Sequence, residues 1–415
     1  MVTKTILVIG TYDTKNAELT YVCDTIRAQG GGVISMDVSV LGDPAEPTDV
    51  SKHDVAAAAG KTIQDAIDSG DENHAMQIMA QGAARLCATL YADGKIDGMI
   101  GLGGTMGTDL VLDCAQALPM GVPKFVVSTV SFSPLIPADR LSPDIHMILW
   151  AGGLYGLNSV CKSSLSQAAG AVLGAAQAVE PPVRDRPVIG MTSLGSSCLM
   201  YMKLLREPLL ERGFEVAVFH ATGMGGMAFE ALARQGYFAA VLDLALPELS
   251  NLMVGSVVSS GPDRLTNAGA AGIPQIVSPG CADLIDFAGW QDIPAAYRDR
   301  PFHAHNRLVK SSGLSGDERR ALIRLVAQRL EQAQGPVHFL MPLHGVEEWD
   351  KAGQPAHDPD ALVAMIDEVR RSISNAVPTT EVDAHINDQA FADAVLAIVD
   401  DWIADGTLSA TGVAA

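Results

Sequence analysis

Residues 5–15 of this 415-residue chain read TILVIGTYDTK, and this stretch decides the fold. Apolar side chains fill Ile6 to Ile9, which predicts a buried parallel strand, and the glycine and polar residues after it predict a turn. Helical spacing continues from Lys15 to Gln29, and a second strand is predicted over Val33 to Val38. A strand, a turn, a helix and a parallel strand form the repeating unit of a doubly wound sheet.

The second half of the chain repeats this pattern. Residues 187–192 read PVIGMT, a helix is predicted from Cys198 to Glu211, and a strand follows from Phe214 to His220. We therefore predict an α/β protein with two Rossmann-like, doubly wound domains, mostly parallel sheets and a cleft between the domains. Three prolines in residues 180–187 are typical of a linker, so the domains are predicted as 1–182 and 183–415.

Composition limits the classes of partner and compartment. The net charge is −20, which opposes binding to nucleic acid or to an anionic membrane. The six cysteines form no C-x-x-C pair, and no apolar stretch reaches the roughly 18 residues of a membrane helix. The N-terminus shows no signal-peptide pattern. We expect a cytoplasmic protein with reduced thiols.

Two loops in the first half have the character of phosphate sites. Residues 10–15, GTYDTK, stand where the first strand gives way to a helix, and free amides there favour an anion. Thr11, Thr14 and Lys15 can donate to phosphate, whereas Asp13 would cap the helix, bind ribose or bind magnesium. Residues 101–108, GLGGTMGT, follow a predicted strand and match neither a Walker loop nor the G-x-G-x-x-G fingerprint. The structural alternatives are a capped helix start and a tight turn.

The second half offers weaker candidates. Residues 220–226, HATGMGG, follow a strand, and His220 could be an acid/base or a structural residue. His344 lies in the loop after another predicted strand, over 337–340, and could likewise be an acid/base or a structural residue. Cys281 could be a nucleophile, but no histidine is close in sequence, and Asp283 is expected to cap a helix over 284–287.

A metal site is not predicted. His303 and His305 are two residues apart, but no neighbouring carboxylate or cysteine completes a ligand set. The chain also has neither a G-x-S-x-G elbow nor an H-E-x-x-H motif, which disfavours the corresponding hydrolases and zinc proteases.

Four motifs in order, at residues 10–15, 103–108, 220–226 and 272–280, together resemble one family. It is the ATP-binding domain family named after a plant tobamovirus-resistance protein, and the resemblance runs from Lys4 to about Val369. It implies two Rossmann-like domains, ATP binding and homodimers. In the plant members a barrel-like domain is fused to this one, and it has no counterpart in these residues, so the antiviral role is not transferred.

The resemblance also implies which residues contact the ligand. The family has a Thr-Thr-Thr-Glu segment after the strand that follows the third motif, whereas this chain has Ala245, Leu246, Pro247 and Glu248. That departure puts a second ligand, or the chemistry, in doubt. The implied contacts are Thr11, Asp13, Thr14, Lys15, Gly103, Gly104, Thr105, Gly107 and Thr108, with His220, Thr222, Gly223, Gly225 and Gly226 facing the same cleft.

The leading hypothesis is a protein that binds ATP, with magnesium held by the phosphates and Asp13, and that couples ATP to chemistry on a small metabolite. A second hypothesis is an enzyme for a small carboxylate or keto acid, with His220, His305 or His344 as acid/base. A third is a regulatory protein whose ligand closes the domains without turnover.

Overall fold

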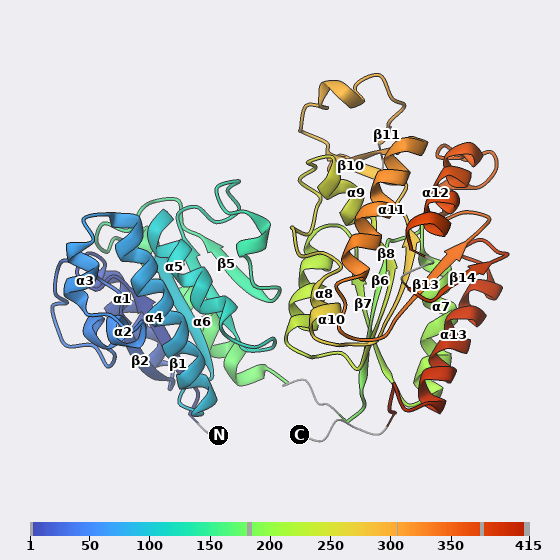
Figure 1. Ribbon diagram of the computed structural model, residues 1–415. Helices are drawn as coiled ribbons and strands as arrows, with labels where there is room; N and C mark the ends of the chain where they lie inside the picture. Colours follow the sequence, from blue (N-terminus) through green and yellow to red (C-terminus); the bar gives the residue numbers. More distant parts are fainter. Residues whose placement is uncertain (1–2, 181–184, 305, 374–376, 411–415) are drawn as a thin grey trace. The chain divides into compact units, whose positions relative to one another are not determined.

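The computed structural model describes residues 3–180, 185–304, 306–373 and 377–410 (Figure 1). The chain forms two compact units, residues 1–182 and 183–415. Each unit has its own parallel sheet and its own apolar core.

Unit 1 is built on five parallel strands in the order β2-β1-β3-β4-β5. The chain order reverses between β1 and β3, which makes this the switch point where open α/β sheets bind ligands. The strands are β1 (Thr5–Gly10), β2 (Gly32–Asp37), β3 (Gly98–Gly103), β4 (Lys124–Ser128) and β5 (Ile145–Leu149).

Helices cover both faces of the unit 1 sheet, as the continuous apolar strands require (Figure 1). On one face lie α1 (Asn16–Ala28) and α6 (Ser159–Ala178). On the other lie α2 (Lys52–Ala58), α4 (Glu72–Ala92) and α5 (Thr105–Gln116), with α3 (Ile63–Asp68) beside α4 and the short η1 (Ala138–Arg140) near α5.

Unit 2 repeats this topology with one more strand, in the order β14-β13-β9-β8-β6-β7. All neighbours in this sheet are parallel, and its switch point lies between β6 and β8. The strands are β6 (Val188–Ser193), β7 (Glu215–His220), β8 (Ala240–Ala245), β9 (Gln275–Gly280), β13 (Val337–Pro342) and β14 (Thr379–Val382).

Two helix layers and a small antiparallel sheet complete unit 2. One face packs on α7 (Leu199–Glu211) and α13 (Gln389–Ala404), and the other packs on α9 (Pro247–Met253), α11 (Gly316–Leu330) and α12 (Pro359–Ser372). The remaining elements are α8 (Met224–Arg234), α10 (Asn267–Ala270), η2 (Ala295–Tyr297), η3 (Glu348–Asp350) and the sheet of β10 (Leu284–Ala288), β12 (Val309–Gly313) and β11 (His303–Ala304).

The predicted fold class is confirmed, because both units are doubly wound α/β structures with parallel main sheets. The helix predicted over 284–287 is wrong: these residues belong to the buried strand β10, so Asp283 caps no helix. The helices after the second and third motifs begin at Thr105 and Met224, inside those motifs. Among the residues that the structure describes, no helix is both long and apolar enough to span a membrane.

Candidate functional site

The two predicted phosphate loops of unit 1 line one pocket of about 610 Å³. They meet because β1 and β3 are neighbouring parallel strands whose carboxyl ends lie at the same sheet edge. The predicted residues that line the pocket are Thr11, Asp13, Thr14, Lys15, Gly103, Gly104, Thr105 and Gly107.

The turn after β1 presents donors to this pocket. The amides of Thr14 and Lys15 both donate to the carbonyl of Thr11, and the hydroxyls of Thr11 and Thr14 are 3.0 Å apart. Among the residues that the structure describes, no side chain accepts from the first amides of α1, so these donors are left without a side-chain cap. The ammonium of Lys15 lies 5.2 Å from the ring centroid of Tyr155, which holds its charge beside the turn.

Asp13 has a structural task at the pocket. Its carboxylate accepts from the Ser39 hydroxyl at 3.0 Å and from the Gly42 amide at 3.3 Å. These bonds attach the loop after β2 to the turn after β1, and that loop contributes Leu41 to the pocket wall. Asp13 therefore positions the wall whatever else it binds.

The turn after β3 contributes a second helix start without a side-chain cap. Gly104 is the N-cap of α5, and no side chain accepts from its first amides. A side chain at Gly103 would lie 2.6 Å from the backbone of Gly107, so that glycine is needed for the turn. At Gly104 the nearest atom to an added Cβ would be 3.8 Å away, so packing within the protein does not require glycine there.

Thr108 does not belong to the pocket lining. It is buried, and its hydroxyl shares a 2.6 Å hydrogen bond with the Ser128 hydroxyl, which joins the first turn of α5 to the end of β4. Its predicted contact with a nucleotide is therefore not supported.

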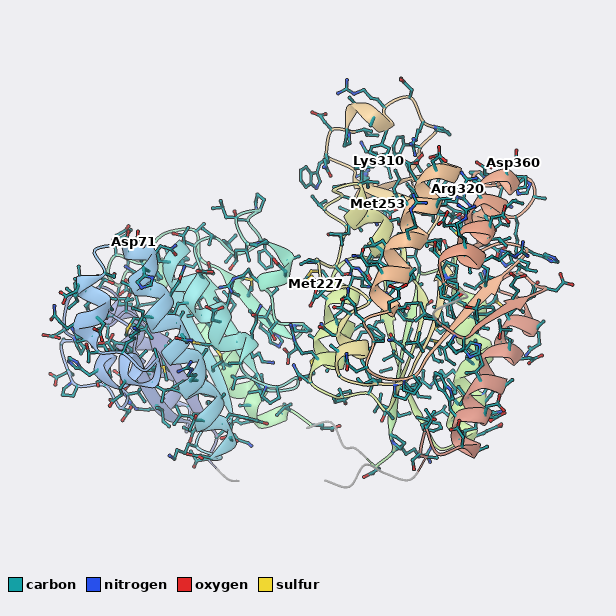
Figure 2. All side chains as sticks on the ribbon, viewed as in Figure 1. Asp71, Met227, Met253, Lys310, Arg320 and Asp360 are labelled. Atoms are coloured by element: carbon teal, nitrogen blue, oxygen red, sulfur yellow. The ribbon has the colours of Figure 1, made fainter. Side chains whose placement is uncertain are left out.

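The opposite wall of the pocket comes from α3, α4 and the loop after β2, and none of its residues was predicted as part of a site. Asp71 caps α4 by accepting from the His74 amide, and it lies at the end of that helix (Figure 2). No sequence motif marks this wall, because its residues read as ordinary amphipathic helix. Its members are Val40, Leu41, Ala66, Ile67, Gly70, Asp71, Glu72, Ala75 and Met76.

In unit 2 the third motif uses its amides internally. Gly223 and Gly226 donate to Oε1 of Glu248 at 2.6 and 3.0 Å. An added Cβ would lie 2.0 Å from Glu248 at Gly226 and 1.8 Å from the His220 carbonyl at Gly225. The amides of Gly223 and Gly226 are therefore engaged by a carboxylate of the protein, and contact of Gly223, Gly225 and Gly226 with a nucleotide stays a prediction.

Glu248 belongs to a buried ion network. Nε of Arg264 donates to Glu248 at 2.8 Å, and the same guanidinium pairs with Asp243 and, at 3.3 Å, with Glu230. All four side chains are at most 2% exposed, and burial raises the pKa of Glu230 to about 7. Nη2 of Arg264 also donates to the Ala245 carbonyl at 3.0 Å, which attaches this network to the end of β8.

The remaining predicted residues are dispersed. His220 and Thr222 line a pocket of about 470 Å³ in unit 2 with Ser196 and Ser197, and Nδ1 of His220 accepts from the Gly195 amide at 3.3 Å. His344 lies on the surface, 2.9 Å from Asp383, and lines none of the pockets described here.

The thiol and metal candidates gain no support. Cys281 is fully buried against Cys198, and burial raises the pKa of its thiol, which disfavours a nucleophile. The ring of His303 packs against Trp349, with centroids 4.7 Å apart. His305 lies outside the described residues.

These features define a class: a two-unit, doubly wound α/β protein with a pocket at the switch point of its first sheet. The chain belongs to the uncharacterised protein family UPF0261, whose N-terminal domain model matches residues 4–181 and whose C-terminal domain model matches residues 186–403.

Relatives cover the whole of this fold. A UPF0261 protein of Brucella melitensis is 54% identical over 99% of this chain and 98% of its own length, and one of Clostridium tetani is 32% identical over 94% and 97%. The tomato ToMV resistance protein Tm-1 is 28% identical over 94% of this chain and 54% of its own length. The predicted relationship to the plant protein is thus confirmed. A solved thioesterase domain from the curacin biosynthetic pathway aligns over 52% of this chain and 91% of its own length, with a TM-score of 0.26 at 10% identity.

Proposed function

We propose that this protein binds a nucleotide, with ATP as the candidate, in the pocket of unit 1. One observation carries the proposal: two helix starts without side-chain caps, those of α1 and α5, border the same pocket at a switch point. By contrast, α2, α3 and α4 of the same unit are capped by Ser51, Thr62 and Asp71.

The pocket has the two halves that a nucleotide requires. Amides, the hydroxyls of Thr11, Thr14 and Thr105, and the ammonium of Lys15 form a polar half for phosphates. Leu41, Ile67, Met76 and their neighbours form an apolar half for a base. A volume of about 610 Å³ suits a ligand of nucleotide size.

Magnesium fits the charges of this pocket. Asp13, Asp71 and Glu72 line it against a single lysine, so a bare polyphosphate would meet repulsion. A divalent cation carried by the phosphates would offset these carboxylates, and each oxygen of Asp13 keeps a lone pair beyond the one that accepts its hydrogen bond. The residues present therefore suit a magnesium–nucleotide complex. The resemblance found in the sequence also implies ATP.

The proposal is tested by isothermal titration with ATP, ADP, AMP and adenosine in the presence of Mg²⁺. Because the polar half binds phosphates, we expect affinity to fall along this series, and a Lys15→Ala variant to weaken ATP by about tenfold. Gly104→Val would place a side chain at the start of α5 and abolish binding.

Gly174→Val is the matched control, since a Cβ at Gly174 in α6 meets nothing within 4 Å and this residue lines no pocket described here. It should bind ATP as the unmodified protein does. Equal affinity for adenosine and ATP, or the absence of ATP binding, would overturn the proposal.

A further inference from the structure

Unit 2 contains a second pocket, of about 500 Å³, that no sequence motif marks. It lies between β12, the start of α11 and the segment around η3. It adjoins the pocket of His220, because Leu284, Ser311 and Trp349 line both.

Arg319 is the unusual residue of this wall. It stands in the first turn of α11, it lines the pocket, and it is 1% exposed. Its Nε donates to the Leu314 carbonyl at 3.1 Å, but its Nη1 is buried with no hydrogen-bond partner among the described residues. A buried donor without an acceptor costs about 1–3 kcal/mol, so this group is poised for an acceptor that the chain does not supply.

The counter-ion of Arg319 does not satisfy it. The carboxylate of Asp283 lies 3.6 Å from Nη2, beyond hydrogen-bond range, and neither oxygen of Asp283 has a hydrogen-bond partner in the described chain. Arg300 on the same wall differs, since its Nη1 and Nη2 each donate to Glu318 at 2.8 Å and its Nη1 also donates to the Gly313 carbonyl. Arg319, in contrast, has no carboxylate within hydrogen-bond range among the described residues.

The rest of the wall is suited to an apolar body. The ring of Phe302 and the packed pair of His303 and Trp349 form one side. The polar neighbours are already engaged: Ser311 donates to Asp286, Ser312 to the Pro301 carbonyl, and Ser315 to Glu318. The other apolar members are Leu284, Pro301, Leu314, Pro355 and Ala356.

From this arrangement we propose that unit 2 has a binding site for a small carboxylate with an apolar or aromatic body, held through the guanidinium of Arg319. A carboxylate matches the planar fork of an arginine, and the apolar wall takes the remainder of the ligand. The site is in a different unit from the nucleotide pocket, and the inference does not rest on the proposed nucleotide.

The test uses the full chain and two probes of the same shape, phenylacetate and its neutral analogue phenylacetamide, in isothermal titration. We expect phenylacetate to bind at least about tenfold more tightly than the amide, because only the carboxylate gains a charged bond. Arg319→Met should remove this preference. Arg320→Met is the matched control: Arg320 is the next residue of α11 (Figure 2), and it pairs with Asp317 rather than lining the pocket.

A pocket-filling variant keeps the proposal testable if Arg319→Met does not fold. Ala356→Leu changes no ion pair and should weaken phenylacetate by about tenfold. The proposal is overturned if the acid and the amide bind equally, if phenylacetate does not bind at about 20 mM, or if both variants bind it unchanged. A Lys15→Ala variant should bind it normally, which separates this site from the nucleotide pocket.

Discussion

The amide of Gly223 donates to Oε1 of Glu248 over 2.6 Å, and Oε2 of the same carboxylate accepts from Arg264 at 2.8 Å. The loop after β7 thus encloses an anion that belongs to the protein. In unit 1, by contrast, the glycine-rich loop after β3 lines a pocket. This difference explains why two units of the same topology are expected to hold ligands in different places.

Glu248→Gln should destabilise unit 2. The substitution keeps the size of the side chain but puts an amide NH₂ group opposite either Nε of Arg264 or the amides of Gly223 and Gly226, so buried donors lose their acceptor and we expect a loss of about 3 kcal/mol in the free energy of unfolding. Urea denaturation measures this loss. Asp317→Asn is the control, because that side chain is 94% exposed and should change stability little. Equal stability of the two variants would show that the network contributes nothing.

Gly225→Ala and Gly104→Ala separate a structural glycine from a site glycine. The new Cβ would lie 1.8 Å from the His220 carbonyl at Gly225, so we expect a loss of at least about 2 kcal/mol there. At Gly104 the nearest atom is 3.8 Å away, and stability should stay within about 0.5 kcal/mol. Thermal and urea unfolding compare the pair. A large loss at Gly104 would mean that this glycine serves the fold alone.

Glu347 should make stability depend on pH. Burial, followed by the charge of Asp283, raises the pKa of Glu347 to about 9. The folded state therefore keeps a proton that the unfolded chain loses above its ordinary pKa of 4.5. Its contribution to stability consequently falls as pH rises from about 5 to 8, by up to about 1.4 kcal/mol per unit.

The Glu347→Gln variant isolates that contribution, because the amide does not titrate. Urea unfolding at pH 5, 6, 7 and 8 should show the variant gaining stability relative to the unmodified protein at each step. Parallel pH profiles would mean that Glu347 is ionised in the folded protein.

The sequence predicted the fold well because its strands are short, mostly apolar runs, with β1 and β3 among those that end in glycine. Ile6 to Ile9 are fully buried in β1, as their pattern required. The helix predicted over 284–287 is wrong, since a short apolar run has no period that distinguishes a buried strand from a buried helix.

The candidate site was predicted in part. The turns at Thr11 and Gly104 could be found because parallel strands bring their ends together. The hydrogen bond of the Gly223 amide could not be predicted, because it depends on Glu248, 25 residues away, and on buried Arg264. The isolated Nη1 of Arg319 likewise results from packing that no local pattern encodes.

Hydrogen–deuterium exchange with and without magnesium and ATP tests the central claim most directly. We predict that nucleotide slows exchange at residues 11–18 and 103–110, the two helix starts of unit 1. Exchange at residues 220–226 should stay unchanged, because the amides of Gly223 and Gly226 already donate to Glu248. The Gly104→Val protein should show no slowing. Unchanged exchange at both unit 1 segments, or slowing confined to residues 220–226, would contradict the account.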